Sequence, residues 1–380
     1  MRFLFASDSF KGTLTSRQVA ELLAEELPAC LPDATCESLY VGDGGEGTLD
    51  AVVASTGGEL RTVLVRGPLG ETVGATFALL PDGRALIEAA AANGLTLVPQ
   101  ELRDARKTTS YGVGQLVLAA LDAGARDITV GIGGSATNDA GLGMLLALGV
   151  RFATQDDVPI TGCGGELYLV TGVDTSGMDP RLAECRFHVM CDVTNPLCGH
   201  QGATHVFGPQ KGLLPRQVVP LDCDMYTFSR VVAETLGVDC SEEPGAGAAG
   251  GLGFAFRAFL GAELQRGIDC VLDLVRFDEA LARVDVCVTG EGRFDAQTAG
   301  GKVIEGVARH CAAAGVPCVA VCGAADPAAV EAGLPGLTAV VPCLGALCTS
   351  EEIHANAELN LRLAARRLFG LVALGRSLSA

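Results

Sequence analysis

Residues 128–144 constrain the fold of this chain more than any other segment, and they read ITVGIGGSATNDAGLGM. The β-branched start predicts the end of a buried strand, and the leucines that follow the glycines predict a helix. A strand, a glycine-rich loop and a helix in this order present backbone N–H groups to an anion. Residues 131–136 also fit the dinucleotide fingerprint G-x-G-x-x-A, so the type of anion stays open. The alternative is a tight turn that needs glycine only for positive φ.

Two more glycine-rich loops follow short predicted strands and carry pairs of acids. The loop at 42–47 contains Asp43 and Glu46 among four glycines, and the loop at 290–295 contains Glu291 and Asp295. A turn needs about one such acid, whereas carboxylates suit Mg²⁺ or a substrate hydroxyl. Two acids in each loop therefore favour a function.

The first predicted strand, residues 2–6, leads into a polar turn. Asp8, Ser9 and Lys11 lie in this turn, before a helix that we expect to begin after Thr15 and to end at Pro28. Ligands bind at the carboxyl edge of α/β sheets, where a strand leads into a helix. This position favours a function over turn-shaping for the three polar residues.

The two ends of the chain alternate between predicted strands and helices, and the part between them does not. Runs at 61–66, 71–80 and 84–88 are separated by hairpin turns and predict an antiparallel meander. The sequence therefore predicts an α/β protein with a discontinuous, Rossmann-like parallel domain, residues 1–60 plus 285–380. Residues 61–284 would form an inserted, mixed α/β domain that carries the glycine loop.

Composition excludes several classes of function. The formal net charge of −18 disfavours a nucleic-acid partner, which requires a basic face. No uninterrupted apolar run approaches the length of a membrane span. The 15 cysteines are scattered without metal-binding spacing, which is typical of a reducing compartment, and no signal-peptide pattern is present. We therefore expect a cytoplasmic protein without a membrane partner.

The loops together supply what phosphoryl transfer requires. Backbone N–H groups and lysines such as Lys11 and Lys211 bind phosphates, and carboxylates bind Mg²⁺ or accept a proton. No Walker A motif is present, and its nearest approach, at 296–303, lacks the first glycine and the final Ser or Thr. A complete G-x-G-x-x-G within 245–253 does not follow a predicted strand. The residues alone thus indicate a phosphate- or nucleotide-binding α/β enzyme.

Seven sequence blocks in one order extend this interpretation. They are DSFKGTLTS at 8–16, VGDGGEGT at 41–48, GIGGSATNDAGLGM at 131–144, CDVTNPLCG at 191–199, FGPQKG at 207–212, PGAGAAGGLG at 244–253 and VTGEGRFDAQTAGGKV at 288–303. Together they resemble the bacterial glycerate kinase family, the type that makes 2-phosphoglycerate. The resemblance implies two α/β domains with a cleft between them, D-glycerate and ATP as substrates, Mg²⁺ as cofactor, and a monomer or homodimer. It favours 2-phosphoglycerate over 3-phosphoglycerate as product.

On this basis we assign roles to the candidate residues. The catalytic candidates are Asp192, Asp295, Lys11 and Asp43. Glycerate would contact Ser9, Lys11, Asp43, Glu46 and Arg293. The nucleotide phosphates would contact Gly133, Gly134, Ser135, Thr137, Asn138, Gly247 and Lys211. Mg²⁺ would be held by Asp192, Asp295 and Glu291.

Two other functions compete with this one. A dinucleotide-dependent hydroxyacid oxidoreductase would use the fingerprint at 131–136, with Asp156 or Asp157 about 20 residues further on. It leaves the other acidic loops unused. A catalytically silent sugar-acid sensor on the same fold is the third possibility, and the intact acids argue against it.

Overall fold

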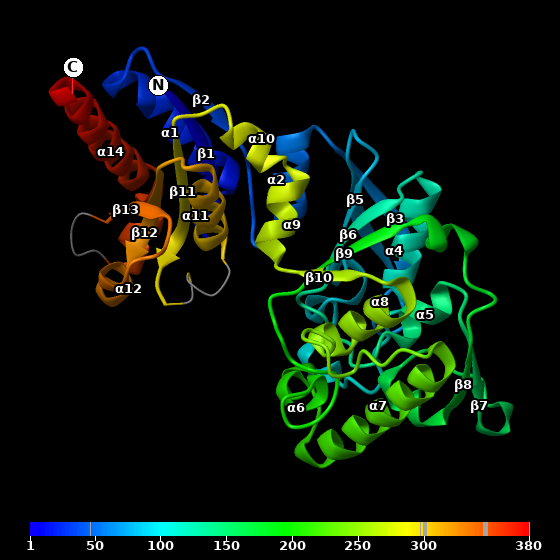
Figure 1. Ribbon diagram of the computed structural model, residues 1–380. Helices are drawn as coiled ribbons and strands as arrows, with labels where there is room; N and C mark the ends of the chain where they lie inside the picture. The colour runs from blue at the N-terminus through cyan, green and yellow to red at the C-terminus, as the bar shows by residue number, and fades with distance from the viewer. Residues whose placement is uncertain (46, 297, 299–301, 345–348, 380) are drawn as a thin grey trace. The chain divides into compact units, whose positions relative to one another are not determined.

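The computed structural model describes residues 1–45, 47–296, 298, 302–344 and 349–379. The chain divides into two compact units (Figure 1). Met1–Gly57 and Ile268–Ala380 form unit 1, and residues 58–267 form unit 2. Our predicted domain limits, at residues 60 and 285, lie close to these divisions but assign the segment 268–284 to the other unit.

Unit 1 is built on a parallel sheet whose strand order in the described residues is β13-β12-β11-β1-β2. The strands are β1 (Arg2–Ser7), β2 (Thr35–Ser38), β11 (Val286–Phe294), β12 (Cys318–Ala325) and β13 (Leu337–Pro342). Numbered within the unit, this is the order 2-1-3-4-5 of flavodoxin-like folds. The direction of progression along the sheet reverses between β1 and β11, and such a reversal leaves a crevice at the carboxyl ends of the strands.

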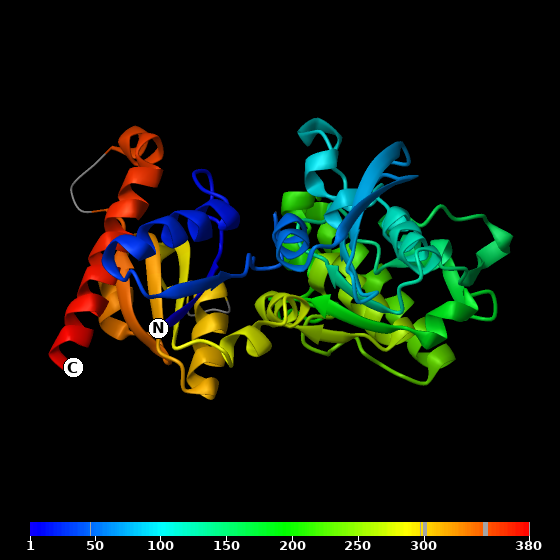
Figure 2. The same cartoon turned by 90° about the horizontal axis from the view of Figure 1, so that it is seen from above.

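Helices cover both faces of this sheet (Figure 2). The α-helices of unit 1 are α1 (Ser16–Cys30), α2 (Thr48–Thr56), α9 (Gly267–Leu274), α10 (Phe277–Leu281), α11 (Val303–Ala314), α12 (Pro327–Ala332), α13 (Ser350–Ala355) and α14 (Ala357–Ser379). Alternate residues of the strands face α1 and α14, and the others face α11, as the period of two predicts. Phe369 of α14 packs on Phe3 and Phe5 of β1, with ring centroids 5.6 Å and 6.1 Å away.

Several local predictions in unit 1 need correction. Helix α1 continues through Pro28 to Cys30, although its predicted N-cap, Thr15, is confirmed. The short strand predicted directly before the loop at 42–47, over residues 38–41, lies earlier in the structure, as β2. Thr349 and Glu352 form a capping box that predicts one long final helix, but in the structure it starts only the short helix α13, which is followed by a separate helix, α14.

Unit 2 contains a mixed sheet with the order β10-β9-β6-β5-β4-β3 in the described residues. The strands are β3 (Glu59–Arg66), β4 (Thr72–Leu79), β5 (Ala85–Glu88), β6 (Asp127–Gly131), β9 (Arg186–Met190) and β10 (Glu263–Gln265), and a separate hairpin pairs β7 (Arg151–Thr154) with β8 (Val170–Asp174). Strands β3 to β5 form the predicted antiparallel meander, and β5, β6, β9 and β10 run parallel. The predicted fold class, a Rossmann-like parallel domain with an interleaved mixed α/β domain, is confirmed.

The helices of unit 2 surround this sheet. The α-helices are α3 (Ala90–Asn93), α4 (Tyr111–Asp122), α5 (Leu142–Ala147), α6 (Ala203–Phe207), α7 (Pro215–Leu236) and α8 (Leu252–Leu260). Short 3-10 helices span η1 (Leu95–Leu97), η2 (Gln100–Leu102), η3 (Gln155–Asp157), η4 (Gly164–Leu169), η5 (Pro180–Glu184), η6 (Pro209–Lys211) and η7 (Ala248–Gly250). Among the helices that the structure describes, none has the length and hydropathy needed to cross a membrane.

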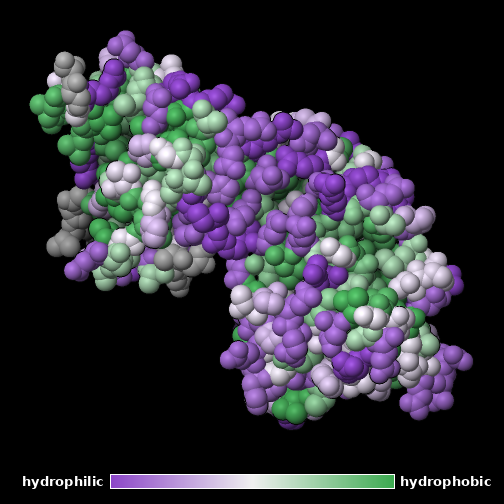
Figure 3. Space-filling view, in the orientation of Figure 1, coloured by the Kyte–Doolittle hydropathy of each residue, from purple (hydrophilic) through white to green (hydrophobic). Residues whose placement is uncertain are grey.

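The C-terminal helix α14 has one buried and one exposed apolar face. Its exposed leucines are Leu359, Leu363, Leu371, Leu374 and Leu378. Figure 3 shows apolar side chains at the surface of the unit that carries the C-terminus. Burial on this helix therefore depends on helical phase and not on residue type, so the two faces provide matched test positions.

We expect Phe369→Ala to destabilise unit 1 and Leu371→Ala to leave it almost unchanged. Phe369 is fully buried, so truncation leaves a cavity that costs about 3–5 kcal/mol. Leu371 is 67% exposed, so its truncation should change the free energy of unfolding by less than about 0.5 kcal/mol. Urea denaturation of the two variants measures both values, and similar costs would contradict the assigned packing.

Candidate active site

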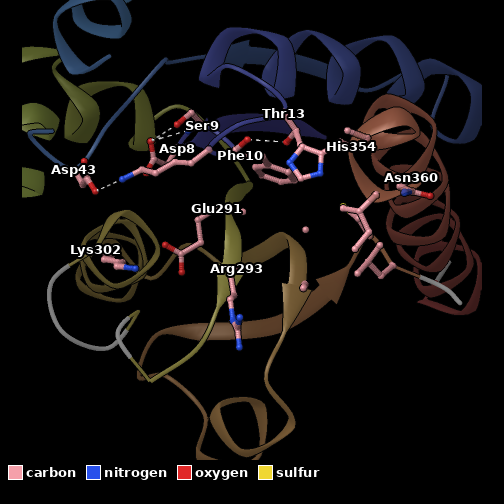
Figure 4. A pocket seen from close by; sticks show the side chains of 18 residues that line it. Asp8, Ser9, Phe10, Thr13, Asp43, Glu291, Arg293, Lys302, His354 and Asn360 are labelled. Atoms are coloured by element: carbon pink, nitrogen blue, oxygen red, sulfur yellow. Dashed lines mark hydrogen bonds and ion pairs between the residues drawn. The ribbon is translucent and has the colours of Figure 1, made fainter. Parts of the chain in front are cut away.

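A cavity of about 320 Å³ lies in unit 1 at the carboxyl ends of β1, β11 and β12 (Figure 4). Its charged and polar lining residues are Asp8, Ser9, Lys11, Thr13, Asp43, Glu291, Arg293, Lys302, His354 and Asn360. This is the point where the strand order reverses, as expected for a ligand site in a doubly wound sheet. Figure 4 shows Asp8, Asp43, Glu291 and Lys302 toward one end of the cavity, and His354 and Asn360 toward the other.

An ion pair joins two predicted site residues at the charged end. Lys11 Nζ lies 2.9 Å from Asp43 Oδ2, and the backbone N–H of Gly45 donates to Asp43 Oδ1 over 3.0 Å. Burial by itself would raise the pKa of Asp43, but the hydrogen bond and charge of Lys11 together with the backbone N–H of Gly45 outweigh it and lower that pKa. Burial likewise opposes the charge of Lys11, yet Asp43 raises the pKa of the lysine. Both groups are therefore charged at neutral pH.

Two buried carboxyl groups near this ion pair have pKa values well above their usual range. Burial and then the charge of Asp43 raise the pKa of Asp8 to about 6. Burial raises the pKa of Glu291 to about 7, with a contribution from Asp8, while a hydrogen bond from Thr298 opposes the shift. Titratable groups with such shifts cluster in functional sites, and a carboxyl group that is partly ionised at neutral pH can act as a general base.

The other predicted residues of the β11 loop lie at or outside the rim of the cavity. Arg293 lines it, but the arginine side chain is 71% exposed and its Nε lies 3.4 Å from Asp295 Oδ2. Asp295 is not among the lining residues, and its backbone N–H donates to Thr298 Oγ1. Ser9 lines the cavity and donates its backbone N–H to Asp8 Oδ1 over 2.7 Å. Glu46 lies outside the described residues.

The glycine loop that follows β6 belongs to unit 2, and most of its side chains are buried. Asn138 donates to Thr204 Oγ1 over 2.9 Å, and Thr137 accepts from Asn93 over 3.1 Å. Thr137 and Asn138 are both fully buried, so their side chains hold the loop in place. Gly133 and Gly134 are exposed and present accessible backbone at the tip of the loop.

A buried carboxylate, Asp139, organises the same loop. Its Oδ2 accepts from the backbone N–H and Oγ of Ser110, and its carboxylate also accepts from the backbone N–H groups of Gly141 and Gly143. Burial nevertheless raises the pKa of Asp139. The four hydrogen bonds compensate for part of the cost of burying the carboxyl group.

Lys211 lies in the interior of unit 2 and supports the glycine loop. Its Nζ donates to Ser135 Oγ over 2.9 Å and to the carbonyl of Thr137 over 2.7 Å. Burial lowers the pKa of Lys211 to about 7, although Asp139 opposes the shift. Lys211 was predicted to contact the nucleotide phosphates, and in the structure its ammonium group donates to oxygens of the glycine loop.

Two further predicted residues of unit 2 also take part in local structure. Asp192 is exposed, and its Oδ1 accepts from the backbone N–H of Gly267 over 2.9 Å. Gly247 donates its N–H to the carbonyl of Asn195, and a Cβ on Gly247 would lie 2.2 Å from the carbonyl of Pro196. Close backbone approach therefore explains this glycine without a ligand.

The predicted Mg²⁺ ligands come from both units, with Asp192 in unit 2 and the acids Glu291 and Asp295 in unit 1. Among the described residues, one group brings three ligand atoms within 4.8 Å of one another, namely the buried thiols of Cys287, Cys311 and Cys318. Mg²⁺ binds through one or two carboxylates together with water and phosphate, so it needs no such closed group.

Five of the charged and polar lining residues were absent from our assignment: Asp8, Thr13, Lys302, His354 and Asn360. Asp8 could have been included, because it directly follows the first strand. Lys302 lies within the segment 296–303, which approaches a Walker A motif. The sequence carried no local signal for His354 or Asn360, whose role depends on where α13 and α14 pack.

Comparison with known proteins identifies the family. A model described as the "Glycerate kinase family" matches residues 3–373. This chain belongs to the glycerate kinase family. It is 42% identical to "Glycerate 2-kinase" of Escherichia coli K12, over 99% of both chains, and 42% identical to "Glycerate kinase" of Bacillus subtilis 168, over 96% of both chains. A crystal structure assigned to glycerate kinase 2 of Salmonella typhimurium LT2 has a TM-score of 0.91 at 42% identity and covers 99% of both chains.

We expect Glu291→Gln to change how stability depends on pH. Folding raises the pKa of Glu291 from its usual 4.5 to about 7, so the folded state holds this proton more tightly than the unfolded state. The stabilisation is present below pH 4.5 and is lost as the pH rises through 7. Between pH 4.5 and 8 the wild type should lose roughly 2–3 kcal/mol relative to the variant.

The glutamine keeps an oxygen that accepts the hydrogen bond from Thr298, so the variant removes only the ionisation. Unfolding free energies at several pH values measure the difference. Glu331→Gln, at an exposed position, serves as the control. Parallel pH profiles for wild type and Glu291→Gln would rule out the shift.

Proposed function

We propose that this protein is a glycerate kinase that transfers the γ-phosphoryl group of ATP to a hydroxyl group of D-glycerate, with 2-phosphoglycerate favoured over 3-phosphoglycerate. The observation that carries the proposal is the full-length family match, with relatives named for this activity at 42% identity. The charged cavity at the sheet reversal supports it, because phosphoryl transfer depends on positioning and on charge stabilisation.

Within this site, the lysines neutralise phosphate charge and an acid accepts the proton of the attacking hydroxyl. Lys11 is held by Asp43 over 2.9 Å, and Lys302 enters the cavity from the start of α11. We place the general base at Glu291, since its pKa of about 7 matches neutral pH. Asp192 and Asp295 are the weaker candidates, because neither lines the cavity.

The residues present also fit a Mg²⁺ ion at Asp8. Its carboxyl group is buried, and among the described residues only Ser9 donates to it, at Oδ1. Asp8, together with phosphate oxygens and water, would hold the ion, which would supply charge neutralisation at the phosphates. Glu291 is the neighbouring acid whose pKa responds to the charge of Asp8.

Unit 2 supplies the second group of candidates. The exposed backbone of Gly133 and Gly134 remains our candidate contact for an anionic group of a substrate. Lys211 and Ser135 would hold that loop in shape. The oxidoreductase alternative gains no support, since Asp156 and Asp157 lie in a separate 3-10 helix and the family match favours phosphoryl transfer.

We further propose a reducing compartment, the cytoplasm, as the site of action. The cysteines of the described residues are free thiols, including the close group of Cys287, Cys311 and Cys318. Neighbouring thiols persist where thiols are kept reduced.

The activity is tested by a coupled assay with D-glycerate, ATP and Mg²⁺, with the product resolved as 2- or 3-phosphoglycerate. We expect turnover in the wild type and a loss of roughly 10²-fold or more in kcat/KM for Lys11→Met, because a phosphate-facing charge is removed. Lys107→Met is the matched control, since Lys107 is an exposed lysine of unit 2. Absence of glycerate phosphorylation in the wild type would contradict the function.

The choice of base is tested separately. Glu291→Gln should lower kcat by roughly 10²-fold or more, whereas Asp192→Asn and Asp295→Asn should cost less than about tenfold. The low-pH limb of the kcat profile should also disappear in Glu291→Gln. A folded Asp192→Asn or Asp295→Asn variant that loses more activity than Glu291→Gln would move the base to that residue.

A further inference from the structure

The cavity of unit 1 has two chemically different ends, and the proposed phosphoryl transfer uses only one. The charged end contains the ion pair and the two buried acids. The other end carries His354 and Asn360 (Figure 4), and the neighbouring residues Ile353 of α13 and Ala357 of α14 also line the cavity. The remaining apolar lining residues of the cavity are Phe10, Ala324, Cys343 and Leu344. We call this second end the apolar end. The phosphoryl transfer itself does not explain which part of a substrate binds there.

A rigid turn forms one wall of the apolar end. Phe10 and Leu14 exchange backbone hydrogen bonds, and the side chain of Thr13 donates to the carbonyl of Phe10 over 2.7 Å. The ring of Phe10 is 5% exposed, so this wall is fixed before any ligand binds. A preformed aromatic surface costs little ordering entropy on binding.

The C-terminal helices form the opposite wall. Ala357 and Asn360 lie three residues apart on α14 and therefore share one helical face, and Ile353 reaches the cavity from α13. His354 lies beside the turn, since a Cβ on Gly12 would be 3.8 Å from its Nε2. Figure 4 shows the rings of His354 and Phe10 and the amide of Asn360 around this end.

We propose that the apolar end binds the adenine base of ATP, with Phe10, Ile353 and Ala357 against its faces and the amide of Asn360 at its polar edge. This inference rests on the proposed kinase function. Among residues that the structure describes, none forms a hydrogen bond with the Asn360 side chain, so its donor and acceptor are available to a ligand.

The chemistry of the two substrates decides which of them binds at the apolar end. Glycerate carries a carboxylate and two hydroxyl groups on three carbons, so it gains nothing from apolar walls and needs the cations of the other end. A purine base is flat and aromatic with a polar edge, and it matches an apolar pocket with a few polar groups. A volume of about 320 Å³ also exceeds what a three-carbon acid fills.

This placement orients the nucleotide. With the base at the apolar end, the phosphates point toward Lys11 and Lys302, both of which line the same cavity. The nucleotide then lies at the β1/β11 reversal, as doubly wound sheets commonly place it. The proposal therefore assigns ATP to unit 1, instead of to the glycine loop of unit 2 whose side chains are largely buried.

The test fills the apolar end and leaves the charged end intact. Ala357→Phe adds a ring in the cavity, and Leu359→Phe adds the same ring on the exposed face of the same helix. We expect Ala357→Phe to raise the KM for ATP and the Kd for Mg·ADP by roughly tenfold or more. The KM for glycerate should change by less than about threefold, and Leu359→Phe should change neither constant. Thermal melting verifies that both variants are folded.

Asn360→Ala provides a second readout. It should weaken ADP binding and reduce the preference for ATP over GTP, because the amide would recognise the edge of the base. A change confined to the KM for glycerate in Ala357→Phe, or an unchanged Kd for ADP in both variants, would overturn the inference while leaving the kinase function in place. A wild type that binds ADP with this sensitivity but phosphorylates no glycerate would instead refute the function and retain the nucleotide site.

Discussion

The parallel pairing of β1 with β11 is the constraint on which the cavity of unit 1 depends. The two strands are separated in sequence by the whole of unit 2, yet they pair in register from Phe3 with Val286 to Ser7 with Gly290. This register places Asp8 and Glu291, the next residues on each strand, at one edge of the sheet. A shift by one residue would point alternate side chains to the other face and separate the two acids.

The local part of this arrangement was predictable from the sequence. Glycine-rich segments with acids after short apolar runs indicated strand ends, and Lys11, Asp43 and Glu291 were identified in this way. The pairing of β1 with β11 and the cover provided by α14 depend on contacts between distant segments. A single sequence has no local pattern for such contacts, and for this reason His354 and Asn360 were missed while Asp192 and Asp295 were favoured.

The glycine loop after β6 carries the most specific motif of the chain. The motif alone nevertheless does not show which of its residues contact a ligand. The glycines of the segment after β6 were expected to leave room for phosphate, and Gly133 and Gly134 are indeed exposed. Gly143, however, serves close approach, since a Cβ there would lie 2.2 Å from Thr109 Oγ1. Asp139 and Lys211 then hold the loop in place with hydrogen bonds. Glycines in such a segment can leave room for a ligand or allow close packing inside the protein. Only the burial of each glycine in the structure shows which of the two applies.

The net charge of −18 affects how the cavity attracts its ligands. Both proposed substrates are anions, so the overall field of the protein opposes them and local cations must attract them. Lys11, Arg293 and Lys302 gather at the cavity for this purpose. The raised pKa values of Asp8 and Glu291, about 6 and about 7, reduce the negative charge that incoming phosphates meet near neutral pH.

A cation bound at Asp8 would lower the pKa of Glu291, because compensating a neighbouring negative charge favours ionisation. Glu291 would then be ionised to a greater extent when a divalent cation accompanies the nucleotide, although burial still opposes its charge. This coupling would make the proton acceptor at Glu291 most available when the phosphates and their cation are in place.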